Sequence, residues 1–572
     1  MNKDFELNAR GQKDHEQKSQ VVTSKERPRR GSLRAQSRRS FLKGLGAAVA
    51  SVPFAAAARA AVPDVLSNTK KPLDLNGRPE EAFQKRLKAA RFDRRISLKS
   101  FRNNGDEASY PSGIANYSKG FAHNNFGEVD PSAYALYLAA IRTGRRKDFD
   151  NLPMGGTSPL IDPQAGLAFD LETCDPTQNS IPPFDNLASP GLASQTIESY
   201  WQALTRDVPF SEYDSDPLIA DAVSELTKLS AFEGPRIGGS VTPQSLFRGF
   251  TALDLIGPYV SQFFLQPFTY GAMPFVGYMT TLPGDFGIDP AYWLRLQNGQ
   301  KPFASPNPDS TLRYLRNGRD LAEYVHNDVL YQEYLNAALM LMTMKAPLNA
   351  GNPYESLASE TGFITFGFPM LEVLLAEVVA RALKNAWFQK WFVHRMARPE
   401  ETGGLVHYTL TGAKTYPLDK SLLSSKAVAA TFARNGNYLL PLSYPEGCPQ
   451  HPSYPSGHAT AAGASVTILK WFFDENFVIP NPLVTTSDGL TTVTYTGTDA
   501  GQITVGGELN KLASNVGFGR AFAGIHWRQD AEQGMILGET VAIDLLRNQA
   551  HLYNENYRGF SFTKFDGSNI TV

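Results

Sequence analysis

Cysteine is almost absent from this chain. Only Cys174 and Cys448 occur among its 572 residues, and neither belongs to a CxxC pair or to a cysteine and histidine cluster with the spacing of a zinc site. A cysteine-based zinc site is therefore excluded. For the two cysteines themselves, the sequence leaves open one disulfide or two buried thiols.

A large excess of charge of either sign is also lacking. The formal net charge is −1, so no broad basic field is available to attract nucleic acid or anionic lipid. A small, neutral or anionic substrate is the better expectation. With 42% hydrophobic and 19% charged residues, the composition is neither disordered nor fibrous, and the chain can bury a large core.

Long apolar runs are missing as well. Beyond the N-terminal region no stretch reaches about 18 apolar residues without a charge, so we expect no membrane span. The nearest candidate, residues 366–383, contains Glu372, Glu377 and Arg381. Its leucines and valines recur at helical spacing, which predicts an amphipathic helix with one buried face.

The N-terminus has the features of an export signal. Residues 1–36 are polar and charged, and we expect them to be disordered. The twin arginines Arg38 and Arg39 are followed by the short apolar run 45–58 and by an A-x-A site that ends at Ala60. This order is typical of a twin-arginine signal peptide cleaved after Ala60, and it predicts export to the periplasm or the extracellular space. The alternative is a basic linker before an alanine-rich helix.

Helical patterns dominate the mature domain, residues 61–572, and we place its catalytic half at about 318–550. Long irregular stretches rich in Pro, Gly, Asn and Asp separate these patterns and indicate a site covered by loops. One β-hairpin is expected, with strands at 490–495 and 502–505. Further helices are predicted over residues 131–143, 195–205, 217–232, 319–344, 456–473 and 528–548.

Two segments of the catalytic half offer positively charged side chains and the start of a helix. In the first, Lys390 and Arg398 lie about two turns apart in a helix that we expect to end at Pro399. In the second, Ser456 and Gly457 immediately precede a helix of small residues. A helix start of this kind supplies backbone N–H groups, a positive dipole end and a hydroxyl, which together suit an anion.

A third segment adds a guanidinium and a histidine. Arg520 and His526 lie six residues apart, and Asp530 follows His526 at i+4, where its carboxylate can accept the other ring proton of the histidine. Each segment alone is weak evidence. All three in this order predict a binding site for a tetrahedral oxyanion.

These three segments resemble the superfamily of vanadium-dependent haloperoxidases and type-2 phosphatidic acid phosphatases. The superfamily pattern consists of a lysine followed by Arg-Pro, a Pro-Ser-Gly-His turn, and an Arg and His segment that ends in Asp. The resemblance implies a mainly α, helical-bundle vanadium haloperoxidase/acid phosphatase-like fold, with vanadate as the cofactor.

The same resemblance implies a role for each residue. His526 would be the metal ligand, with Asp530 orienting its ring. His458 would be hydrogen-bonded to the apical hydroxide and would act as an acid–base catalyst, together with His451. The remaining vanadate-binding groups would be Lys390, Arg398, Arg520, the Ser456 hydroxyl and the Gly457 N–H.

Two features favour the algal type of bromoperoxidase within the superfamily. Seven residues separate Lys390 from Arg398, one more than in the phosphatases and the fungal chloroperoxidases. His451 stands seven residues before His458, where the algal type has a second active-site histidine. At two positions the sequence differs from what is common in the family. Gln389 precedes the lysine where red-algal members tend to have arginine, and Gly519 replaces a serine that we expect to matter little.

The function implied is oxidation of bromide or iodide by hydrogen peroxide to hypohalous acid, which then halogenates small organic substrates. The alternative enzyme is a secreted acid phosphatase in which His526 attacks phosphorus. A third alternative is a catalytically silent secreted shell protein. Related proteins form dimers and larger assemblies, so the resemblance also implies a homo-oligomer.

Other residues are interpreted as structural. Glu323 and His326 have the E-x-x-H spacing of di-iron sites, but without a convincing second motif we expect an ordinary surface or packing pair. Asp254 is a candidate partner for His458 across the pocket. Six further residues are expected to pack rather than bind: His123, His394, His407, Trp387, Trp391 and Trp527.

Overall fold

The computed structural model describes residues 75–572. The chain divides into two units, residues 1–81 and 82–572. Of the first unit only the last seven residues are described, and the predicted disordered segment and signal peptide, residues 1–60, lie outside the described part. The second unit holds all the predicted site residues.

The described chain is mainly helical, as predicted, with three small two-stranded antiparallel sheets. The strands are β1 (Thr269–Tyr270), β2 (Met273–Pro274), β3 (Leu483–Thr485), β4 (Thr492–Thr494), β5 (Ser561–Thr563) and β6 (Asn569–Thr571). The helices are α3 (Arg78–Asp93), α4 (Asp106–Ser109), α5 (Pro131–Thr143), α6 (Arg146–Asp150), α7 (Pro190–Thr205), α8 (Pro217–Lys228), α9 (Pro290–Gln297), α10 (Gly318–Asn327), α11 (Gln332–Thr343), α12 (Phe368–Phe388), α13 (Pro399–Leu410), α14 (Lys420–Leu423), α15 (Lys426–Asn435), α16 (Gly457–Phe472), α17 (Val505–Phe522) and α18 (Arg528–Ala550).

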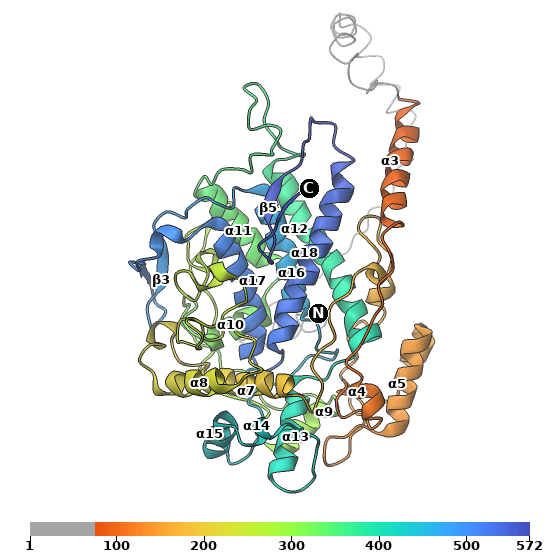
Figure 1. Cartoon of the computed structure of the whole chain (residues 1–572), viewed down its shortest axis with the longest axis vertical. Coiled ribbons are helices and arrows are strands. Elements are labelled where there is room, and N and C mark those ends of the chain that lie inside the picture. Colours follow the sequence, from red (N-terminus) through yellow and green to blue (C-terminus); the bar gives the residue numbers. More distant parts are fainter. Residues whose placement is uncertain (1–74) are drawn as a thin grey trace, which may run out of the picture. The chain divides into compact units, whose positions relative to one another are not determined.

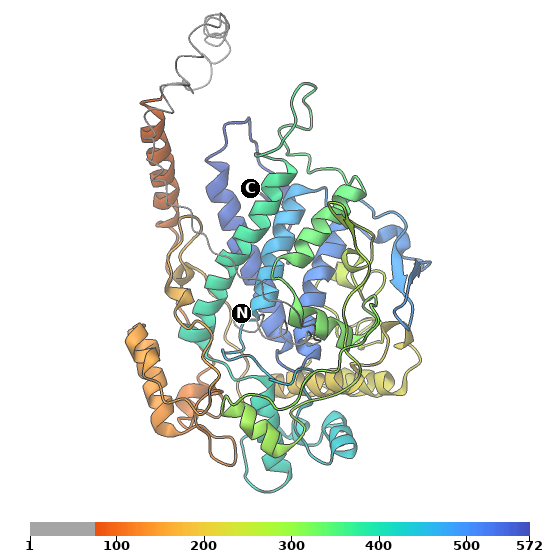
Figure 2. The same cartoon turned by 180° about the vertical axis from the view of Figure 1, so that it is seen from behind.

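Helices α12, α16, α17 and α18 form a bundle at the centre of the second unit, and α10 packs against α17 (Figures 1 and 2). Helices α7 and α8 run across one end of this bundle (Figure 1). Every residue of α17 is buried, and α16 is buried except at His458. The bundle therefore provides a dry interior in which electrostatic interactions are strong.

Several predicted helices are confirmed. The helix α5 spans the predicted residues, and α16 lies within one residue of its predicted ends. The amphipathic segment 366–383 is α12, which buries Leu371, Leu375 and Val378. No described helix is long and apolar enough to cross a membrane.

The predicted helix over 319–344 is wrong in one respect, because the chain breaks it into α10 and α11. Asp328 adopts an extended conformation directly after α10, with φ −65° and ψ 153°. Asn and Asp side chains compete with helical hydrogen bonds, and Asn327 and Asp328 stand together at this point. Asp328 therefore lies in an extended segment between the two helices.

The predicted hairpin is misplaced. The strand near 490–495 exists as β4, but its partner is β3, with Val484 opposite Val493. Residues 500–502 form a 3₁₀ turn and Val505 begins α17. The true turn contains Asp488 and Gly489, and Gly489 has a φ of +70°, a conformation that glycine adopts without strain.

Candidate active site in the helical bundle

The first predicted segment does not run as a helix to Pro399. After α12 the chain forms a π-helical turn, Gln389–His394, and Arg395 then takes a left-handed conformation with φ +46°. A π-helical turn contains an extra residue, and such turns occur often at functional sites. This geometry buries Lys390 in the turn and Arg398 at the start of α13, both at 0% exposure.

Arg398 connects two of the predicted site histidines. Its Nη1 donates to Nε2 of His526 at 3.0 Å, and its Nη2 donates to Nδ1 of His451 at 3.0 Å. Lys390 Nζ donates to the carbonyl oxygens of Pro452 at 2.9 Å and Ser453 at 2.5 Å. The first segment and the loop before α16 therefore meet at one place.

The second segment begins α16 as predicted. Ser456 is the N-cap, and its hydroxyl accepts a hydrogen bond from the Ala459 N–H. Gly457 is the first helical residue, and a Cβ there would lie 3.0 Å from the Trp387 ring, which itself packs against His451 at 4.8 Å between ring centres. A glycine at this position lets the tryptophan cover the start of the helix.

The third segment fixes the orientation of His526. Its Nδ1 lies 2.6 Å from Asp530 Oδ2, and the Trp527 N–H donates to the same oxygen at 3.1 Å. The Ser453 hydroxyl also donates to Asp530. Because a carboxylate accepts the Nδ1 proton, Nε2 carries the lone pair, which accepts the Arg398 hydrogen bond and is the one that a metal would use.

Positive charge is concentrated around this lone pair. Burial, together with the Arg398 and Arg520 guanidinium groups, holds the pKa of Lys390 well below its usual range. Burial and the charges of Arg398 and Lys390 hold the pKa values of His526 and His451 well below theirs. Burial raises the pKa of Asp530 to about 6, although Lys390 opposes the increase.

The charge balance of these groups calls for an anion. In residues 75–572, Asp530 is the only carboxylate among the charges that act most strongly on Lys390 and Arg398. The lowered pKa of Lys390 shows that Asp530 does not compensate the positive charge of the neighbouring guanidinium groups, and uncompensated buried charge is costly. No group of three or more His, Cys, Asp or Glu side chains in the described chain could hold a free cation. Vanadate, an oxyanion with a single protein ligand, fits this site.

Arg520 is held by the end of α10. Its Nη1 donates to the Val325 carbonyl at 2.8 Å, and its guanidinium lies 5.4 Å from the centre of the Tyr444 ring. His326 stacks on the same ring at 3.8 Å and lies 2.6 Å from Glu446 Oε1 through Nε2. Glu323 Oε2 lies 3.8 Å from His326 Nδ1, so the two residues form a pair within one helix, as predicted, and His326 packs on the same tyrosine ring as Arg520.

His458 and its partner lie at the edge of the site. The His458 side chain is 19% exposed, and its Nε2 is 3.1 Å from Oδ1 of Asp328, whose side chain is 4% exposed. Asp254, the partner considered from the sequence, instead accepts a hydrogen bond from Ser514 at 2.8 Å. Sequence reasoning missed Asp328 because it lies within a predicted helix, although the Asn-Asp pair was an available turn signal.

The remaining interpretations concern packing. Burial lowers the pKa of His394 to about 3 and that of His123 to about 4, so both are neutral structural side chains. A Cβ at Gly519 would lie 3.0 Å from the Leu321 carbonyl, so this glycine permits the contact of α17 with α10.

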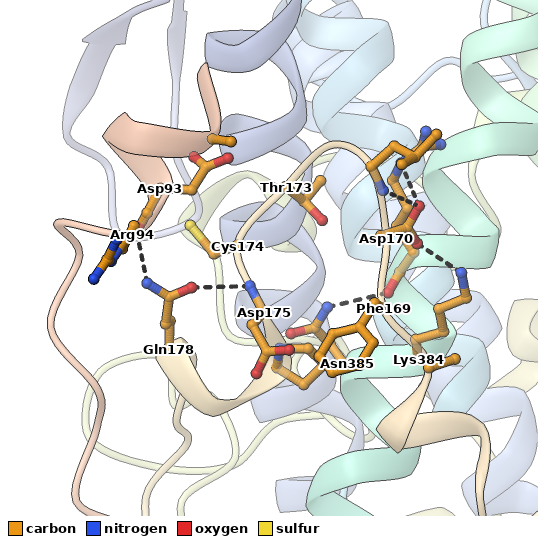
Figure 3. A pocket seen from close by; sticks show the side chains of 15 residues that line it. Asp93, Arg94, Phe169, Asp170, Thr173, Cys174, Asp175, Gln178, Lys384 and Asn385 are labelled. Atoms are coloured by element: carbon orange, nitrogen blue, oxygen red, sulfur yellow. Dashed lines mark hydrogen bonds and ion pairs between the residues drawn. The ribbon is translucent and has the colours of Figure 1, made fainter. Parts of the chain in front are cut away.

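The cysteines are buried free thiols, which decides between the two alternatives left open by the sequence. Cys174 borders a polar pocket of about 230 Å³ beside the loop 168–178 and α12 (Figure 3). None of the predicted site residues lines this pocket. Burial raises the pKa values of both Cys174 and Cys448, so neither thiol is a reactive nucleophile.

The fold and the site define a helical-bundle protein with a buried site for an oxyanion. This site, the cradle, is formed by Lys390, Arg398, Arg520 and the start of α16, with His526 beside them. A family model of the VCPO second helical-bundle domain matches residues 372–555. A vanadium-dependent bromoperoxidase from Ascophyllum nodosum is 35% identical over 528 residues, which cover 88% of this chain and 93% of that protein. One from Corallina officinalis is 32% identical, covering 87% of this chain and 100% of that protein.

A solved structure agrees with these relatives. The homohexameric second vanadate-dependent bromoperoxidase of Ascophyllum nodosum superposes with a TM-score of 0.82 at 31% identity, over 87% of this chain and 91% of that chain. The chain belongs to the family of vanadium-dependent bromoperoxidases.

Proposed function

We propose that this enzyme oxidises bromide with hydrogen peroxide at a vanadate bound in the bundle, and that the resulting hypobromous acid halogenates small organic molecules. The observation that carries the proposal is that Lys390, Arg398 and Arg520 converge on His526, whose ring is oriented by a carboxylate at Nδ1. When bound, vanadate supplies Lewis-acid activation of peroxide without a change in its oxidation state.

The residues of the site would have separate roles toward the bound vanadate. His526 Nε2 binds the metal, and Asp530 holds the ring in the required tautomer. Lys390, Arg398 and Arg520 would hold the oxyanion and would stabilise the negative charge that develops on it. The hydroxyl of Ser456 and the N–H of Gly457 donate hydrogen bonds at the start of α16.

Proton transfer is assigned to the histidines beside the cradle. His458, with Asp328 at 3.1 Å, is partly exposed and can exchange protons with solvent. His451 is buried against Arg398 and Trp387 and is neutral, so it can accept a proton or a hydrogen bond at neutral pH. His458 therefore lies beside a carboxylate, whereas His451 lies beside a guanidinium group.

The phosphatase alternative is not favoured. Phosphate and vanadate have the same shape, and the type-2 phosphatidic acid phosphatases would use a similar cradle. The additional residue between Lys390 and Arg398, accommodated here by the π-helical turn, and the presence of His451 separate this chain from them. Its full-length similarity is to bromoperoxidases.

Reconstitution tests this proposal. Protein made without vanadium should be inactive as a peroxidase, because no described side chain in the site can activate peroxide by itself. Orthovanadate should restore bromination of monochlorodimedone, and inorganic phosphate should slow this recovery by occupying the same cradle. Rapid phosphomonoester hydrolysis by the apo protein, without vanadate-dependent bromination, would replace the peroxidase assignment with the phosphatase.

We also propose that the protein is exported through its twin-arginine signal and assembles as a homo-oligomer. The arginine pair, the apolar run and the A-x-A site support the first point. The homohexameric relative that superposes on most of the chain supports the second. Light scattering on the purified mature protein gives the number of subunits, and a monomer would contradict the second point.

A further inference from the structure

A second buried carboxyl group lies behind Asp328. Asp328 occupies the break after α10, and Glu333 lies in the first turn of α11. The two carboxyl groups are close enough for a hydrogen bond between them when one of them carries a proton. Glu333 is 1% exposed, so water does not separate its charge from that of Asp328.

Three oxygens of this pair have no N–H or O–H donor among the described residues. They are Asp328 Oδ2 and both carboxyl oxygens of Glu333. Two adjacent carboxylates in a buried place repel each other strongly, whereas a proton between them supplies the missing hydrogen bond. The geometry therefore requires that one of the two groups is a neutral acid.

The surroundings decide which group keeps the proton. Burial raises the pKa of Asp328, but the charge and hydrogen bond of His458 outweigh it and bring the pKa to about 2. Burial and the adjacent Asp328 charge raise the pKa of Glu333 well above its usual range. No cation is among the groups that shift the pKa of Glu333. Its charge in turn raises the pKa values of four phenols: Tyr270, Tyr278, Tyr324 and Tyr334.

We propose that Glu333 is a positioning residue, a neutral carboxylic acid whose O–H donates to Asp328 Oδ2 and so holds the Asp328 carboxylate toward His458. This inference rests on the acid–base role proposed for His458. Removal of the donor would free Asp328 to rotate and would raise its pKa, since a hydrogen bond to a carboxylate favours the charged form. His458 would then lose its fixed partner.

Glu333→Gln and Glu333→Leu separate this role from simple packing. The glutamine amide can still donate to Asp328 Oδ2, so we expect kcat for bromide within about twofold of the parent, and near-normal pH dependence. Leucine has a similar size and no donor. Loss of a supporting partner of this kind commonly reduces activity about 10–100-fold, and we expect the same for kcat. Vanadate retention in dialysis should stay unchanged, and the acid limb of the kcat profile should move to higher pH.

Infrared difference spectroscopy gives a readout that does not depend on activity. At neutral pH the parent should show the carbonyl stretch of a neutral carboxylic acid that disappears in Glu333→Gln. Glu372→Gln, which removes an exposed carboxylate from α12, should leave that band unchanged.

Two outcomes would overturn the inference: no band lost in Glu333→Gln, or a kcat loss in Glu333→Gln as large as in Glu333→Leu. The infrared result decides the matter even where Glu333→Leu does not fold. Failure of the proposed function would look different, because the parent protein itself would then show no vanadate-dependent bromination while the infrared band remained.

Discussion

At the scale of single residues, two histidines near the cradle differ in what holds them. His526 is fully enclosed, with Nδ1 on Asp530 and Nε2 directed at Arg398. His458 is partly exposed and contacts Asp328 at the edge of the bundle. A buried, oriented imidazole suits metal binding, and a solvent-accessible one suits proton exchange.

This difference predicts opposite consequences for two alanine variants. His526→Ala should abolish vanadate binding, because the remaining hydrogen bonds alone must then hold the oxyanion. His458→Ala should keep vanadate and lose most turnover, by about 10²–10⁴-fold, the usual contribution of a general acid or base. Equilibrium dialysis with vanadium analysis measures the first quantity and bromination the second. Equal vanadate retention by the two variants would reverse the assignment.

His451 bears on the choice of halide. It packs between Arg398 and Trp387, and burial together with neighbouring cations keeps it neutral. We expect bromide to be oxidised much faster than chloride near neutral pH, because chloride is harder to oxidise. His451→Phe should shift the ratio toward chloride or lower activity at neutral pH. Monochlorodimedone assays with each halide test this, and a parent enzyme equally fast on both would contradict it.

At the scale of elements, the contact of α16 with α18 depends on glycine. A Cβ at Gly538 would lie 2.0 Å from the Thr460 carbonyl oxygen and 2.6 Å from the Ala464 nitrogen. A Cβ at Gly463 would lie 2.1 Å from the Met535 carbonyl oxygen. These obstacles are backbone atoms, so the helices would have to separate to accept a methyl group.

Gly538→Ala should therefore destabilise the protein and weaken its cofactor site. Overpacking of a tight core costs about 1–3 kcal/mol, and we expect at least this loss in the free energy of unfolding. The start of α16 carries Ser456, so the vanadate affinity should fall as well. Urea unfolding and dialysis measure both effects. Gly501→Ala, where the added methyl meets no atom within 4 Å, should change neither quantity.

The sequence predicted the presence of the helices better than the breaks between them and the pairing of the strands. Periodicity located α5, α12, α16 and α18 because each has a continuous buried face. Periodicity did not show that the helix over 319–344 breaks at Asp328, although Asn327 and Asp328 are a local turn signal, or that β4 pairs with β3 through the turn at Gly489.

The site residues were predictable for a different reason. Lys390, Arg398 and His526 belong to short motifs whose residue types carry the chemistry, and the structure brings them together. Asp328 and Glu333 have no motif. Their importance comes from the break between two helices, which local sequence patterns did not identify.

At the scale of the whole molecule, the cradle is assembled from parts that are far apart in sequence. Lys390 follows α12, Ser456 begins α16, Arg520 ends α17 and His526 precedes α18. An unfolded chain therefore has no vanadate site. A twin-arginine signal, which exports proteins that have already folded, is compatible with a site of this kind, because the site can form before transport.

The arginine pair should accordingly control where the enzyme is found. In a bacterial host with this pathway, changing Arg38 and Arg39 to lysine in the full-length chain should retain the protein inside the cell, because the pathway reads this pair. The charge stays the same, so folding should not change, and the retained protein should become active with added vanadate. The same double change at Arg29 and Arg30, outside the motif, should leave export intact, and the exported protein should begin at Ala61 by mass spectrometry. Normal export of the Arg38 and Arg39 variant, or an exported chain that still contains the arginine pair, would contradict the prediction.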